Sequence, residues 1–333
     1  MNDASHPPGH SMPVYRADCF VVSEGANLGD PLTCADDLML DDVYTLAPAA
    51  QPLRLALHTQ DTEYLTVADG GDCSTAGAVI HLDCALTLMS PDGQTTDAIV
   101  LVEVDAAGHI AQVYLLPLAA LAKRTPYALV GLDRAEARTK FAQLACARFT
   151  RGTHITLASG AQKPIEDLQI GDRVLTRNDG VQALRWIGQS TVRATGNFAP
   201  ICICAGTLNN ERDLIVSPDH RLFIYQRKDR LGAGRSELLV KARHLVNGDS
   251  VTVQDGGFVD YFELLFDAHQ IIYAEGIAAE SMLIDTRTRP VVPNEVSARL
   301  TKHVNTGLSG LDVTEALLNR PDAADLLRRA STR

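Results

Sequence analysis

The stretch Phe149-Thr-Arg-Gly-Thr-His-Ile155 is followed, after a short polar loop, by Pro164-Ile-Glu-Asp-Leu-Gln-Ile-Gly-Asp-Arg-Val-Leu-Thr176. Further along stands Val216-Ser-Pro-Asp-His220. Each stretch combines β-branched or aromatic residues with glycine and other turn-forming residues, a mixture typical of short strands joined by tight turns. The three stretches therefore predict a β-rich module in the second half of the chain.

The same alternation continues on both sides of these stretches. Glycine-containing turns such as Pro91-Asp-Gly93 and Asn178-Asp-Gly180 separate the strand candidates, as expected for antiparallel hairpins. In the first half of the chain we expect strands over 53–58, 78–84, 98–104 and 109–115. In the second half we expect them over 155–157, 173–176, 183–187, 201–204, 213–216, 221–225 and 270–274.

These patterns divide the 333-residue chain into five segments. Helix formers between two β regions predict a helical linker, with Asp133 as its N-cap. The overall prediction is a mostly β protein: a disordered leader over 1–13, a small N-terminal β domain over 14–132, the linker over 133–147, a second β module over 148–290 and a helical C-terminal tail over 291–333.

Taken as a set, the motifs of the second half resemble the Hint module, the self-cleaving all-β fold of hedgehog C-terminal domains and inteins, and in particular its bacterial Hint_2-like group. Gly152-Thr153 fits the opening strand of that module, and the acidic stretch that contains Gly171-Asp172 fits its loop and second strand. Trp186-Ile-Gly188, Ser217-Pro-Asp-His220 and the stretch from Leu265 to His269 fit later blocks. The resemblance implies a Hint-type fold over about 140 residues.

The resemblance also implies a chemistry. A cysteine at the first position of the module attacks the preceding carbonyl, and a histidine of the later Thr-x-x-His block contacts the scissile amide. Here Ser217 stands in place of the threonine and His220 is the block histidine. The candidate site residues are Cys146, Thr153, Ser217, His220 and His269.

Two departures from the family pattern bear on function. Arg148 occupies the position of the nucleophilic cysteine, and a guanidinium with a pKa above about 12 is no nucleophile. Glu280-Ser281 stands where inteins carry His-Asn, so we expect no splicing. Whether the chain is an enzyme acting on itself therefore depends on Cys146, which is alternatively a small apolar residue at the end of the linker.

Two hypotheses remain open from the sequence. In the first, Cys146 attacks the Ala145 carbonyl in an N-to-S acyl shift, His220 protonates the amide nitrogen, and water or an unidentified external nucleophile resolves the thioester. The N-terminal β domain is then the passenger. In the second, the module is a degenerate scaffold with a binding or structural role, in which Arg148 forms a cationic niche for a carboxylate or phosphate.

The overall composition and charge limit the kinds of partner and cofactor that we expect. A net charge of −11 disfavours nucleic acid, and we expect no membrane span, because the longest apolar run is short and interrupted by Pro117. The seven cysteines show no metal-ligand spacing, and no metal or other cofactor is expected. Without a signal-peptide pattern at the start of the sequence, we expect a cytoplasmic protein or one exported by a signal-independent route.

Overall fold

The computed structural model describes residues 10–58, 65–69, 71–105, 107–226, 229, 232–285, 287–293, 295–296 and 313. It is mostly β, as the sequence predicts, and its described helices are one α-helix, α1 (Glu136–Ala145), and five short 3-10 turns. The chain forms two compact units. Unit 1 contains residues 1–143 together with Asp285–Val291, and unit 2 contains the remainder.

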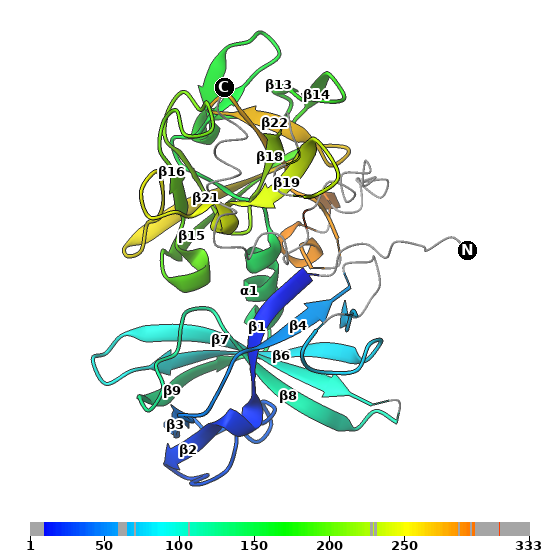
Figure 1. Cartoon of the computed structure of the whole chain (residues 1–333). Helices are drawn as coiled ribbons and strands as arrows, with labels where there is room; N and C mark the ends of the chain where they lie inside the picture. The colour runs from blue at the N-terminus through cyan, green and yellow to red at the C-terminus, as the bar shows by residue number, and fades with distance from the viewer. Residues whose placement is uncertain are drawn as a thin grey trace. The chain divides into compact units, whose positions relative to one another are not determined.

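Unit 1 is built on a nine-stranded sheet whose described strand pairs are antiparallel. Figure 1 shows β9, β6, β7 and β8, which are successive neighbours in the middle of this sheet. The strands are β1 (His10–Arg16), β2 (Phe20–Glu24), β3 (Val43–Leu46), β4 (Leu53–Leu57), β5 (Leu65–Thr66), β6 (Val79–Met89), β7 (Thr95–Val104), β8 (Ile110–Pro117) and β9 (Pro126–Asp133), with the 3-10 turn η1 (Ala17–Cys19) after β1.

Local signals account for several elements of unit 1. The predicted turn between β6 and β7 is present, with Gly93 at a positive φ of 79°, a conformation that glycine adopts without strain. The carboxylate of Asp133 accepts the N–H groups of Ala135 and Glu136 at the start of α1. The expected leader was wrong in its last four residues, His10–Pro13, because β1 pairs them with β4. Residues 1–9 lie outside the described part of the chain.

Unit 2 contains two six-stranded sheets and one two-stranded sheet, again antiparallel. One sheet runs in the order β15-β21-β10-β17-β16-β20, and the other in the order β12-β11-β22-β23-β18-β19. The strands of the first are β10 (Phe149–Thr150), β15 (Trp186–Arg193), β16 (Ile201–Ile203), β17 (Leu214–Val216), β20 (Val251–Val253) and β21 (Phe258–Leu265).

The second sheet and the small hairpin complete unit 2. They comprise β11 (His154–Thr156), β12 (Gln162–Pro164), β18 (Arg221–Tyr225), β19 (Glu237–Lys241), β22 (Ile271–Ala274), β23 (Ile277–Glu280) and the hairpin β13 (Arg173–Leu175)–β14 (Val181–Ala183). The 3-10 turns are η2 (Ile165–Asp167), η3 (Gly196–Phe198), η4 (Ala242–Leu245) and η5 (Arg289–Val291), the last in unit 1. The predicted helical tail over 291–333 lies almost entirely outside the described residues.

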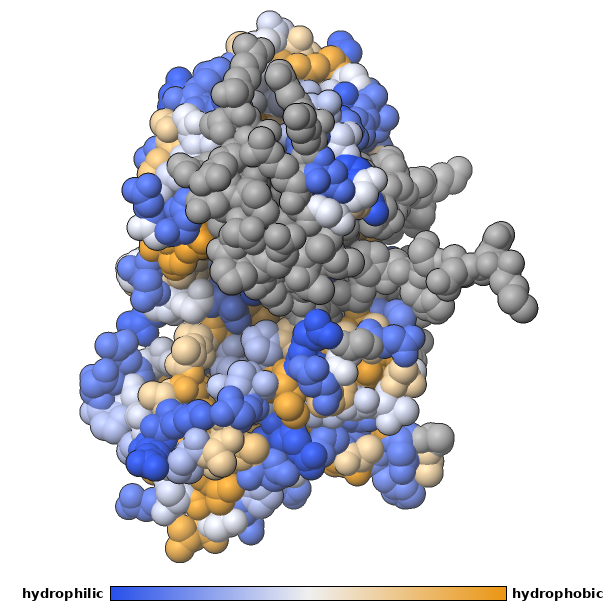
Figure 2. All heavy atoms as spheres, in the orientation of Figure 1, coloured by the Kyte–Doolittle hydropathy of each residue, from blue (hydrophilic) through white to orange (hydrophobic). Residues whose placement is uncertain are grey.

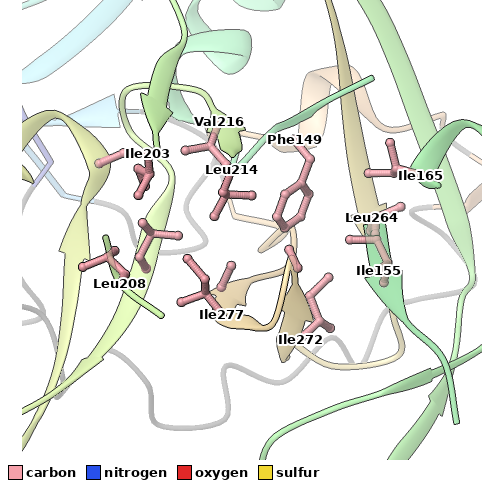
Figure 3. Close-up of a cluster of buried hydrophobic side chains, with 14 of the residues drawn as sticks. Phe149, Ile155, Ile165, Ile203, Leu208, Leu214, Val216, Leu264, Ile272 and Ile277 are labelled. Atoms are coloured by element: carbon pink, nitrogen blue, oxygen red, sulfur yellow. The ribbon is translucent and has the colours of Figure 1, made fainter. Parts of the chain in front are cut away.

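One hydrophobic core joins the sheets of unit 2. Figure 3 shows Phe149, Leu264, Ile272 and Ile277 pointing into it from β10, β21, β22 and β23. All four side chains are buried, and burying a side chain of this size stabilises the fold by about 1.5–3 kcal/mol. Figure 2 shows polar and apolar residues interspersed over the coloured surface. The core fixes β10, and so the residue just before it, in the middle of a sheet.

Candidate functional site

Residue 148 lies between two strands that come from distant parts of the sequence. Phe149 pairs with Val216 of β17 on one side and with Phe262 of β21 on the other. Continuing both antiparallel registers by one residue places Ser217 and Glu263 opposite Arg148. The main chain at the start of the module is therefore held from both sides at the position where the family pattern expects a nucleophile.

Ser217 binds this junction through both its main chain and its side chain. Its N–H donates to the carbonyl oxygen of Arg148 at 2.9 Å. Its Oγ accepts the N–H of Arg148 at 3.3 Å and donates to the carbonyl oxygen of Cys146 at 3.4 Å. Since Ser217 is only 2% exposed, these bonds form away from solvent. One hydroxyl thus contacts the amide nitrogen of the Ala147–Arg148 peptide bond.

His220 lies on the carbonyl side of the same residue. Its Nδ1 is 3.0 Å from the carbonyl oxygen of Arg148, and because a carbonyl only accepts, Nδ1 must carry the proton in this bond. The ring packs edge-on against Phe149 with 4.4 Å between centroids. Complete burial lowers the pKa of His220, although the negative charge of Glu280 acts in the opposite direction. We therefore expect a neutral imidazole at pH 7.

The side chain of Arg148 does not face solvent. It is 1% exposed, and its Cζ lies 4.5 Å from the ring centroid of Tyr261 and 5.3 Å from that of Phe198. Nε and Nη1 are buried without a hydrogen-bond partner among the described residues. The suggestion of a cationic niche at the mouth of the module was therefore wrong, because two aromatic rings cover the guanidinium and stabilise it by about 2 kcal/mol.

Cys146 lies directly after α1 with its side chain 1% exposed. Its carbonyl oxygen is held by Ser217, but Nδ1 of His220 contacts Arg148, two residues downstream. No disulfide joins any of the seven cysteines, all of which lie within the described residues. The structure thus brings Cys146, Ser217 and His220 to one junction and directs the two polar side chains mainly at residue 148.

Thr153 and His269, the other two candidates, occupy different surroundings. Thr153 is buried in the turn between β10 and β11, where its N–H donates to Thr150 and its carbonyl accepts the N–H of Ile165. His269 is 1% exposed, and its Nε2 lies 3.3 Å from Oε2 of Glu280. These contacts tie Thr153 to the turn between β10 and β11 and His269 to the end of β23.

Glu263 is a site residue that the sequence analysis missed. It is 4% exposed on β21, and burial raises its pKa to about 7, while the charge of Arg148 partly offsets that rise. A carboxyl with a pKa near neutral can accept or release a proton under physiological conditions. A single acidic residue inside the apolar run Tyr261-Phe-Glu-Leu-Leu-Phe266 was the available signal.

The described residues contain neither a metal-binding cluster nor a membrane-spanning helix. No cluster of three or more His, Cys, Asp or Glu side chains there is arranged to bind a metal ion. In the same part of the chain, no helix is both long enough and apolar enough to span a bilayer.

The second half of the chain is similar to known proteins. The Hint domain family Hint_2 matches residues 146–286. The fold is similar to the gp41-1 intein, with 15% identity over 40% of this chain and 97% of the intein at a TM-score of 0.25. It is also similar to the Ssp DnaB mini-intein variant M86, with 12% identity over 41% and 96% of the two chains at a TM-score of 0.29. A comparison with curated proteins found no match.

Proposed function

Because residues 146–286 are a Hint domain, we propose that this chain carries an autoprocessing site for its own Ala147–Arg148 peptide bond, arrested because the nucleophile is missing. One observation carries the proposal: Ser217 and His220 hold the amide nitrogen and the carbonyl oxygen of residue 148 at 3.3 and 3.0 Å. The nitrogen is the leaving group of cleavage before residue 148, the carbonyl is the next group along the chain, and both contacts are present although residue 148 is an arginine.

The arrested reaction can be written for a thiol at residue 148. The sulfur attacks the Ala147 carbonyl carbon, the bond from that carbon to the nitrogen of residue 148 breaks, and a thioester forms. The thiol proton goes to a base, and the departing nitrogen gains a proton. We assign the thiol proton to Glu263, which stands opposite residue 148 on the neighbouring strand. Ser217 touches the departing nitrogen, which needs the other proton. Water then hydrolyses the thioester.

Arg148 blocks this reaction in two ways. Its guanidinium offers no electron pair for attack on the Ala147 carbonyl. It also occupies buried space beside Tyr261 and Phe198, where a smaller side chain would leave room for reactants. In this proposal the chain stays intact, and the domain serves as a stable module attached to unit 1.

Self-cleavage at Cys146 is the second candidate function. It is favoured by the hydrogen bond from Ser217 Oγ to the Cys146 carbonyl, which places the thiol residue beside the same polar group. In this case the thiol attacks the Ala145 carbonyl and the nitrogen of Cys146 departs. Moving that nitrogen to Ser217 and His220 requires the chain to slip by two residues, which keeps side chains on the same face.

Intact mass distinguishes the two candidates. We expect freshly purified protein to remain at 35.9 kDa with and without added thiol, and we expect Cys146→Ala to behave identically. Cys202→Ala, which removes another buried thiol of unit 2, is the matched control. If a fragment ending at Ala145 accumulates in the wild-type protein and disappears only in Cys146→Ala, Cys146 is the nucleophile and the arrested-site proposal is wrong.

Cleavage at this junction would not by itself free the passenger. Residues Asp285–Val291, at and after the end of the matched Hint region, belong to unit 1, although the sequence placed most of them in the second module. In a variant that cleaves, we therefore expect both fragments on a denaturing gel but one particle of uncut mass by native light scattering. Two separate particles at micromolar concentration would contradict this expectation.

A further inference from the structure

A buried ionic cluster lies at the start of β18, directly after His220. Glu280, at the end of β23, is 4% exposed. Its Oε1 accepts the main-chain N–H of Arg221 at 3.0 Å, and its Oε2 accepts Nε of Arg221 at 2.8 Å. His269 approaches the same Oε2 at 3.3 Å. One carboxylate therefore binds both the backbone and the side chain of the residue that directly follows His220.

Glu280 is charged in this setting. Burial alone would raise its pKa, but Arg221 and His269 hold the pKa well below its usual range. Its negative charge also raises the pKa of His220, against the larger lowering effect of burial. Nε2 of His220 is buried, and the main chain of Glu280, like its carboxylate, raises the pKa of the ring.

The other charged groups around His220 can be named. Arg221 lowers the pKa of His220, and the guanidinium of Arg148 lies in the same core, on the residue whose carbonyl His220 binds. On the other side of the chain, Asp219 pairs with Lys241 at 3.1 Å and with Arg243 at 2.6 Å. Asp219 is thus paired with two cations, and Glu280 is the acidic residue whose charge raises the pKa of His220.

We propose that Glu280 is a positioning residue for His220: its carboxylate anchors the main chain at Arg221 and supplies the negative charge that a protonated His220 needs. A buried imidazolium is costly unless a charge of opposite sign lies near it. Glu280, which stands where inteins carry the histidine of their His-Asn pair, thus supports His220. This inference rests on the proposed function for its catalytic meaning.

The first test needs no cleavage. Ring nitrogen NMR of the full-length native chain gives the pKa of His220 in wild type, Glu280→Gln and Asp219→Asn. We expect Glu280→Gln to weaken proton binding by His220 about tenfold, a fall of about one pKa unit, and Asp219→Asn to leave it unchanged. A purely structural loosening would hydrate the ring and raise its pKa, so a rise or no change in Glu280→Gln would overturn the proposal.

A second variant and a second background complete the design. If Glu280→Gln does not fold, Glu280→Asp moves the charge by one methylene and is expected to give a smaller fall, whereas no change or a rise overturns the proposal. In the Arg148→Cys background, Glu280→Gln should slow cleavage about tenfold at neutral pH. If Arg148→Cys never cleaves while the pKa of His220 still falls, the proposed function is wrong and the role of Glu280 stands.

Discussion

Arg148→Cys is expected to cut the chain between residues 147 and 148, giving one fragment that ends at Ala147 and one that begins at the new cysteine. The amide nitrogen of residue 148 already lies against Ser217 Oγ, and its carbonyl lies against His220. The substitution supplies the missing thiol and leaves these contacts in place. Thiol such as dithiothreitol should accelerate release, because it attacks the thioester, and intact mass spectrometry measures both products.

Two further variants control this experiment. Arg148→Ala opens the same space without a nucleophile and should remain uncut. His220→Ala in the Arg148→Cys background should slow cleavage by about 100-fold, because it removes the hydrogen bond that holds the carbonyl of residue 148 in place. If Arg148→Cys folds but stays intact over days with thiol present, more than the nucleophile has been lost, and the arrested-site proposal fails.

Glu263→Gln is expected to remove a loss of stability that the wild-type protein suffers as pH rises. The pKa of Glu263 is raised from its ordinary 4.5 to about 7 in the folded protein. The folded state therefore binds this proton more tightly than the unfolded chain, and the resulting stability is present at low pH and lost as pH rises through 7. Between pH 5 and 8 the loss amounts to about 2–3 kcal/mol.

Urea unfolding at pH 5 and pH 8 measures this effect. The difference between Glu263→Gln and wild type should be about 2–3 kcal/mol more favourable to the variant at pH 8 than at pH 5. Asp255→Asn, which removes an exposed carboxylate from the turn before the same strand, should show no such change. An equal difference at both pH values would mean that Glu263 is ionised in the folded protein throughout this range.

The sequence predicted the β class and the Hint module because the informative motifs are local. Prediction was weaker where a strand is buried on both faces. Residues 261–265 of β21 are all buried, so this strand lacks the alternation that marks a half-exposed strand. The expected strand over 183–187 is divided at Leu184 and Arg185, because the N–H of Leu184 binds Asp172 while that of Arg185 binds Leu265 in another sheet.

The sequence by itself determined the type of module, the presence of an arginine at residue 148 and the identity of Ser217 and His220 as candidates, since each depends on which residue stands where in a motif. Only the tertiary structure decided that those two side chains contact the main chain of Arg148, Ser217 at its N–H and His220 at its carbonyl, that rings cover its guanidinium, and that Glu263 and Glu280 lie near these residues. The physical reason is that burial and long-range strand pairing set these contacts and the associated pKa values, and both arise only when segments distant in sequence pack together.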